Sequence, residues 1–173
     1  MRHGVQGDLI DVLATDHLVI QEIFSRLENA PADADERRRL MDEVAGELRR
    51  HSAVKEELLY PLLRDLLPHG EALVAKELLE HQESERLLLH LETLSPGQPQ
   101  FDEALSTLIG SVREQIAHEE KVLHGDLAAH CDPEKLRWYG TQAAEVKQKV
   151  AARRSPGGED GLEGEALGSA PAV

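Results

Sequence analysis

Residues 51–61 read His-Ser-Ala-Val-Lys-Glu-Glu-Leu-Leu-Tyr-Pro, and residues 115–125 read Gln-Ile-Ala-His-Glu-Glu-Lys-Val-Leu-His-Gly. The two stretches lie 64 residues apart and share alanine, glutamate and leucine at matching places. The same offset carries His17 onto His81. A repeat at a fixed offset indicates two copies of one structural unit, here a pair of helices.

Four long segments of the chain carry apolar residues at the spacing of an amphipathic helix. They run over residues 8–28, 36–67, 71–94 and 101–129, and short stretches that contain proline separate them. Pro61 lies inside the second segment, where it should kink the helix. The pattern predicts an all-α fold, an up-down-up-down four-helix bundle over residues 8–130.

The C-terminal part of the chain predicts an appendage and a tail. Asp132 and Pro133 are typical of a helix start, and a fifth helix is expected over residues 133–153. Residues 154–173 are rich in glycine and glutamate, and no lysine or arginine occurs from Ser155 onward. Such a segment cannot bury enough apolar surface to order itself, so a disordered acidic tail is predicted.

The composition argues against several classes of partner. Charged residues make up 30% of the chain, and the formal net charge is −14. That balance repels phosphate backbones and anionic headgroups, so neither nucleic acid nor a membrane is expected as a partner. There is no apolar run of the length that spans a bilayer and no signal-peptide pattern, and Cys131 is the single cysteine. A cytoplasmic location is expected.

The repeat relates polar positions that share a helix face with the apolar residues. Residues four apart on a helix lie on one face, so these positions are expected to point into the bundle. The eight positions, in repeat-related pairs, are His17 and His81, Gln21 and Glu85, His51 and Gln115, and Lys55 and Glu119. Burying such groups without partners costs several kcal/mol. A metal ion offsets this cost, and bundle cores build di-iron sites from histidines and carboxylates in this way.

These residues resemble the hemerythrin-like HHE cation-binding family over about residues 8–130. The family has a histidine on the first and third helices and His-x3-Glu on the second and fourth. The matching stretches are Asp16-His17, His51 with Glu56-Glu57-Leu58-Leu59-Tyr60-Pro61, Glu80-His81-Gln82-Glu83, and Glu119-Glu120. The fifth helix with its trailing segment also resembles actinobacterial members. The resemblance implies a non-haem di-iron centre that handles dioxygen, peroxide or nitric oxide.

Two positions depart from the family pattern. Lys55 stands where the second-helix glutamate is expected, and Gln115 stands where the fourth-helix histidine is expected. The predicted metal ligands are therefore His17, His51, His81, Glu85 and Glu119. Glu85 is expected either to replace the carboxylate lost at Lys55 or to form a buried ion pair with Lys55. Five ligands could hold one metal well or two metals poorly. The resemblance implies iron, as a di-iron centre, and mononuclear iron or zinc is the alternative.

Two functions of different classes follow from this pattern. The first is a hemerythrin-like iron protein that binds or reacts with dioxygen, peroxide or nitric oxide, with any turnover being redox chemistry at the metal. The second is a degenerate bundle with one metal or none, acting as a structural or protein-interaction module. The chain lacks the Gly-x-Ser-x-Gly, P-loop and Gly-x-Gly-x-x-Gly motifs, so hydrolase and transferase chemistry finds no support.

Overall fold

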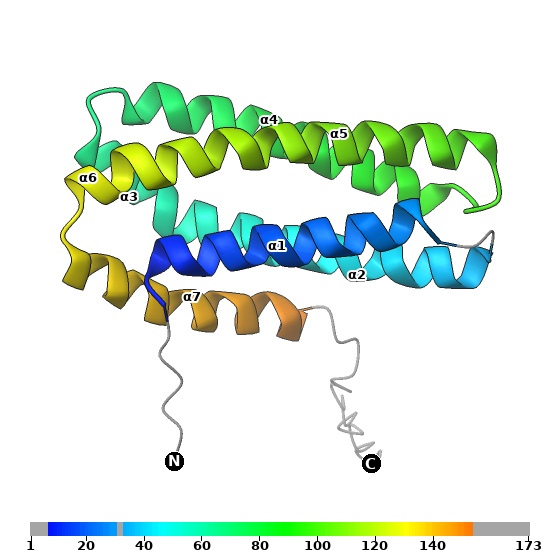
Figure 1. Ribbon diagram of the computed structural model, residues 1–173, viewed down its shortest axis with the longest axis horizontal. Coiled ribbons are helices and arrows are strands. Elements are labelled where there is room, and N and C mark those ends of the chain that lie inside the picture. Colours follow the sequence, from blue (N-terminus) through cyan, green and yellow to red (C-terminus); the bar gives the residue numbers. More distant parts are fainter. Residues whose placement is uncertain (1–6, 31–32, 154–173) are drawn as a thin grey trace, which may run out of the picture.

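The computed structural model describes residues 7–30 and 33–153, and these form the predicted up-down-up-down bundle with a fifth helix against it (Figure 1). The predicted tail over residues 154–173 lies outside the described residues. The bundle consists of α1 (Leu9–Glu28), α2 (Ala34–Val54) with η1 (Lys55–Leu59) and α3 (Tyr60–Leu66), α4 (Gly70–Thr93), and α5 (Pro99–Lys121) with η2 (Val122–Leu127) and α6 (Ala128–His130). The fifth helix is α7 (Pro133–Arg153).

Aspartate side chains start three of these helices. Asp8 accepts a hydrogen bond from the backbone N–H of Asp11 at 3.0 Å, and Asp11 accepts one from the backbone N–H of Asp8 at 3.1 Å. Asp33 caps α2, and Asp132 caps α7 by accepting from the backbone N–H of Glu134 at 2.7 Å. These contacts satisfy N–H groups that have no partner within the helix. They explain why α7 begins where the sequence predicts.

The expected distortion at Pro61 takes the form of a π-helical turn. Proline supplies no backbone N–H to the preceding turn of a helix. Immediately before it, over η1, the chain is wound more widely, and the Tyr60 N–H donates to the carbonyl of Lys55, five residues earlier. The fourth helix carries a similar turn, η2. Short π-helical turns of this kind are frequent at functional sites.

The core consists of two apolar clusters with a buried polar layer between them. One cluster lies around Phe24 and Phe101, and the other lies around Leu13 and Leu62. The buried polar residues are Asp16, His17, His51, Lys55, Glu77, Ser84 and Glu119. His17, for example, lies on α1 between Leu13 of one cluster and Ile20 of the other. Charged groups at such a place must pair with one another or bind an ion.

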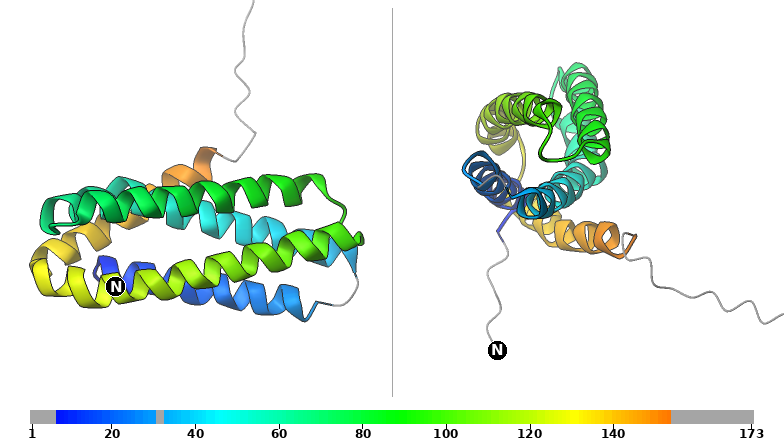
Figure 2. Two further views of the ribbon diagram at one scale, coloured as in Figure 1. Left: turned by 90° about the horizontal axis from the view of Figure 1, so that it is seen from above. Right: turned by 90° about the vertical axis from the view of Figure 1, so that its right-hand side faces the viewer.

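Helix α7 packs along the outside of the α1–α2 pair (Figures 1 and 2). Its own residues Ala143 and Val146 are buried against the bundle, at 0% and 4% exposure. A Cβ atom at Gly140 would overlap the carbonyl oxygen of Gly7, so this glycine allows the helix to approach the start of α1 closely. Among the helices of the described residues, none combines the length and apolar character needed to cross a membrane.

Candidate metal centre

Three side chains from three helices converge in the buried polar layer. His17 of α1 places Nε2 3.2 Å from Oε2 of Glu119 on α5, and His51 of α2 places Nε2 3.4 Å from the same oxygen. One ligand atom from each of the three residues lies within 4.8 Å of the other two. All three side chains are at most 8% exposed. Two imidazoles and one carboxylate are a ligand set that binds iron or zinc.

The outer nitrogen of each imidazole also faces a carboxylate. His17 Nδ1 lies 3.3 Å from Oε1 of Glu120, and His51 Nδ1 lies 3.3 Å from Oδ2 of Asp16. A neutral imidazole has only one N–H, so it cannot donate to carboxylates on both sides. When Nδ1–H donates to the outer carboxylate, the lone pair of Nε2 faces the Glu119 oxygen. These two electron-rich atoms repel each other unless a cation lies between them. Histidine ligands of metals are held by outer carboxylates in this way, so the residues fit a metal ion.

Lys55 places an ammonium group in the buried polar layer, and its partners are not Glu85, the one that the sequence suggested. Its Nζ donates to Oε1 of Glu119 and, at 2.9 Å, to Oε2 of Glu77. The predicted ion pair between Lys55 and Glu85 is therefore wrong. The physical reason is burial: Lys55 and Glu77 are 5% and 4% exposed, whereas Glu85 lies at the edge of the bundle. A buried ammonium requires buried carboxylates beside it.

The charges of the layer shift the pKa values of its members. Burial opposes the charged form of Glu119, but the Lys55 ammonium and the contacts with His17 and His51 hold its pKa well below the usual range. Burial also opposes a charge on His51, yet its contacts with Asp16 and Glu119 raise its pKa above the usual value. Burial raises the pKa of Glu77, which Lys55 offsets only in part. Lys55 and the two histidines thus stabilise the charged form of Glu119 against the effect of burial.

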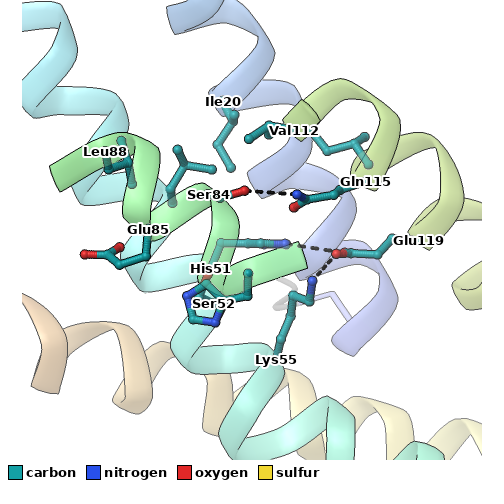
Figure 3. A pocket seen from close by; sticks show the side chains of 13 residues that line it. Ile20, His51, Ser52, Lys55, Ser84, Glu85, Leu88, Val112, Gln115 and Glu119 are labelled. Carbon is teal, nitrogen blue, oxygen red and sulfur yellow. Dashed lines mark hydrogen bonds and ion pairs between the residues drawn. The ribbon is translucent and has the colours of Figure 1, made fainter. Parts of the chain in front are cut away.

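His81 and Glu85, the other two predicted ligands, lie outside this cluster. His81 Nδ1 contacts Oε1 of Glu56 at 2.6 Å, and Glu85 accepts from Arg49 at 3.0 Å. Their side chains are 25% and 34% exposed, so these pairs keep contact with water and avoid the cost of burial. Figure 3 shows Glu85 pointing away from Glu119, toward which His51 and Lys55 both point. Metal ligation by His81 and Glu85 remains a prediction of the sequence.

The comparison with known families agrees with this site. The pattern of the Hemerythrin HHE cation binding domain matches residues 8–127. The chain belongs to this family. The match covers the bundle, including His17, His51 and Glu119, and ends before α7.

Two curated relatives differ in the share of their length that this chain spans. The chain is 26% identical over 144 residues to a protein of Nostoc sp. named DNA nickase, and it spans 40% of that protein's length. It is also 26% identical over 147 residues to an uncharacterized hemerythrin-like protein of Schizosaccharomyces pombe, of which it spans 72%. The aligned parts cover 83% and 84% of this chain.

A solved structure shows the same fold. It is the crystal structure of a Hemerythrin HHE cation binding domain-containing protein from Mycobacterium kansasii, which superposes with a TM-score of 0.70 at 21% identity. The superposition covers 84% of this chain and 88% of that one. At this identity the likeness establishes the fold of the HHE domain and its helix order.

Gln115, the second departure from the family pattern, lies beside the candidate metal centre. Its Nε2 donates to Oγ of Ser84 at 2.9 Å (Figure 3). Next to it is a cavity of about 30 Å³, lined by His51, Glu119 and apolar side chains that include Val112. This volume holds a ligand the size of about two water molecules.

The sequence interpretation missed Glu77, which is among the most buried charges of the domain. It lies on α4 four residues before His81, one turn along the same helix, and that spacing is the signal that could have revealed it. Its Oε1 has no hydrogen-bond partner among the described residues and lies 4.0 Å from Nε2 of His118. The side chain of His118 is 39% exposed.

Proposed function

We propose that this HHE domain is a mononuclear non-haem iron protein that binds or reacts with a small ligand such as dioxygen, peroxide or nitric oxide. One observation carries the proposal: His17 Nε2 and His51 Nε2 both face Oε2 of Glu119, at 3.2 and 3.4 Å, inside the core. Two histidines and one carboxylate, with other positions free, are a typical ligand set of reactive non-haem iron. Iron held there would supply reversible one-electron chemistry and a free coordination position.

Lys55 is the reason for proposing one iron instead of the two that the resemblance implies. Its ammonium group contacts Glu119 and Glu77, the two buried carboxylates on which a second metal would depend. Like charges repel strongly in a medium of low dielectric constant, so a second metal ion is disfavoured while Lys55 is charged. The lysine thus provides the second positive charge of the site.

The cavity beside Glu119 supports the choice of ligand. Its volume of about 30 Å³ excludes organic substrates but accommodates a diatomic molecule or peroxide. Its lining combines apolar side chains, among them Val112 and Ile116, with polar ones, among them Lys55 and Gln115. Such a lining suits a small ligand with a polar end, which the Gln115 amide is placed to orient.

The proposal is tested by counting metal in the purified protein. The chain is produced in iron-supplemented cells, the metal content is measured by plasma mass spectrometry, and near-ultraviolet absorption is recorded. One iron per chain, without the charge-transfer bands of an oxo bridge, is expected. Two irons with those bands would support a di-iron centre instead. A Glu119→Gln variant, which keeps the shape but removes the charged ligand, is expected to lose the metal.

A metal-free structural or protein-interaction module is the second candidate. The observation that favours it is that Lys55 already contacts Glu119 and Glu77, so the layer contains its own cation. In that case both imidazoles would be satisfied by protons rather than by a metal. A purified protein that contains no iron and takes up none from solution would overturn the iron proposal in favour of this second candidate.

The name of the Nostoc relative does not change the proposal. This chain spans 40% of that protein, so nicking activity can reside in the part that has no counterpart here. A formal net charge of −14 also opposes contact with the phosphate backbone of DNA. We therefore propose no nucleic-acid partner for this chain.

A further inference from the structure

The outer partner of His51 is itself held by a residue of α7. Asp16 lies on α1 and is buried, with a side-chain exposure of 9%. One of its oxygens, Oδ2, lies 3.3 Å from Nδ1 of His51, and the other, Oδ1, accepts from Nζ of Lys147. The chain of contacts Lys147–Asp16–His51–Glu119 therefore joins α7, α1, α2 and α5.

The other imidazole of the site has no such support. Its outer partner, Glu120, is 43% exposed, and no lysine or arginine of the described residues forms an ion pair with it. The Glu120 carboxylate can therefore rotate in water, whereas Lys147 fixes both the position and the charge of Asp16. Because the outer carboxylate sets the tautomer and the ring orientation of a metal-binding histidine, the two imidazoles are held to different degrees.

The contact of Lys147 with Asp16 depends on the way α7 packs against α1. The family match ends at residue 127, and α7 begins at Pro133. Gly140 brings α7 against the start of α1, and buried Val146 anchors the turn that carries Lys147. The Lys147 side chain is 25% exposed, so its ammonium reaches a buried carboxylate from a partly covered position. A lysine side chain rarely points its ammonium group toward the protein interior unless a specific partner lies there.

We propose that Lys147 is a positioning residue for the metal centre, which acts through Asp16 to fix the orientation of the His51 ring. Helix α7 is then a functional part of the site and not only an appendage to the bundle. The inference rests on the proposed metal site, because the orientation matters for a metal bound at Nε2. It does not require Lys147 to contact the metal or its ligand.

The test uses Lys147→Met, with Lys149→Met as the matched control. Both lysines lie on α7, and Lys149 is exposed and forms no ion pair within the described part of the chain. The full-length metal-free protein is titrated with Co²⁺ alone, whose visible absorption reports the ligand geometry. Lys147→Met is expected to weaken Co²⁺ binding about 10-fold, a loss of affinity typical for removal of an outer partner of a metal ligand. It should also change the absorption band of the bound Co²⁺. Lys149→Met should match the wild type, and Lys147→Arg should recover most of the affinity.

A second measurement does not depend on metal. The ¹⁵N chemical shifts of the His51 ring are recorded in the metal-free proteins, and they should change in Lys147→Met and stay constant in Lys149→Met. Asp16→Asn, alone and combined with Lys147→Met, completes a double-mutant cycle, in which the two effects should not add. It also provides a second variant if one of them folds poorly.

The outcomes separate this inference from the proposed function. Unchanged His51 shifts together with unchanged Co²⁺ affinity in Lys147→Met would overturn the positioning role and leave the metal site standing. A wild-type protein that binds no Co²⁺, but whose His51 shifts respond to Lys147→Met, would overturn the metal site and support the contact chain.

Discussion

The two halves of the bundle repeat the same pattern of residues, but they use it differently. In the first half, α1 and α2 bury His17 and His51, which are 0% and 6% exposed. In the second half, the counterparts His81 and Gln115 lie nearer the surface, and each bonds to a neighbouring polar group. Helix α7 packs on the first half, where Lys147 supports the site. A repeated helix pair thus gives the same scaffold twice, while the first half supplies both imidazoles of the candidate site and the second half supplies its carboxylate, Glu119.

The largest expected effect is on metal binding through the two imidazoles of the first half. His51→Ala removes a nitrogen that faces Glu119, so the affinity for Co²⁺ should fall by about 100-fold or more, beyond the usual loss for an outer partner. His81 is the counterpart of His17 in the second half, and its outer position predicts that His81→Ala changes the affinity for Co²⁺ less than about 2-fold. Equilibrium titration of the two variants checks the comparison. A large loss in His81→Ala would restore the five-ligand site that the sequence predicts.

The second effect concerns the number of metals. Lys55→Glu restores the residue of the family pattern and places a third carboxylate beside Glu77 and Glu119. Three buried carboxylates without an ammonium repel one another, and a second metal ion would compensate them. We expect the iron content to rise from one toward two per chain, measured by plasma mass spectrometry. Loading that stays at one would show that the second half cannot complete a site.

The third effect is on the stability of the metal-free protein. Lys55→Met keeps the bulk of the side chain but leaves two buried carboxylates without their cation, which should cost about 3–5 kcal/mol of unfolding free energy. Urea denaturation followed by circular dichroism measures it. The matched control is Lys76→Met, because Lys76 is 51% exposed and pairs with Glu80 one turn away. That exposed pair should contribute at most about 0.5 kcal/mol.

The helices were predictable from the sequence because their signals are local. Asp132 and Pro133 mark the start of α7, which the structure places at Pro133. Apolar spacing likewise gives the bundle and its order. The form of the distortion near Pro61 was not predictable, since a π-helical turn depends on how the whole helix packs.

The candidate site was only partly predictable, because its last details are contacts between distant residues. His17, His51 and Glu119 converge as their helix faces require. Helical spacing places a side chain on a face but does not show whether it reaches the centre or stops at the edge. His81 and Glu85 stop at the edge, where residues of the neighbouring helix pair with them.

The contacts of Lys55 and Lys147 show the same limit. Lys55 selects Glu77 and Glu119 on two other helices, and Lys147 reaches Asp16 from 131 residues away. No local pattern connects these partners, so the electrostatic balance of the site becomes visible only in the fold.

The smallest effect separates the contact of Lys147 from the rest of α7. Asp132→Ala removes the N-cap of α7 and should cost about 1 kcal/mol, as should Asp33→Ala at the start of α2. Fraying is confined to the first turn, and Lys147 lies near the other end of α7, so the Co²⁺ affinity of Asp132→Ala should equal that of the wild type. Titration and urea denaturation of the same samples measure both quantities. If Asp132→Ala weakened metal binding as much as Lys147→Met, the packing of the whole helix, and not one ammonium group, would distinguish the first half of the bundle from the second.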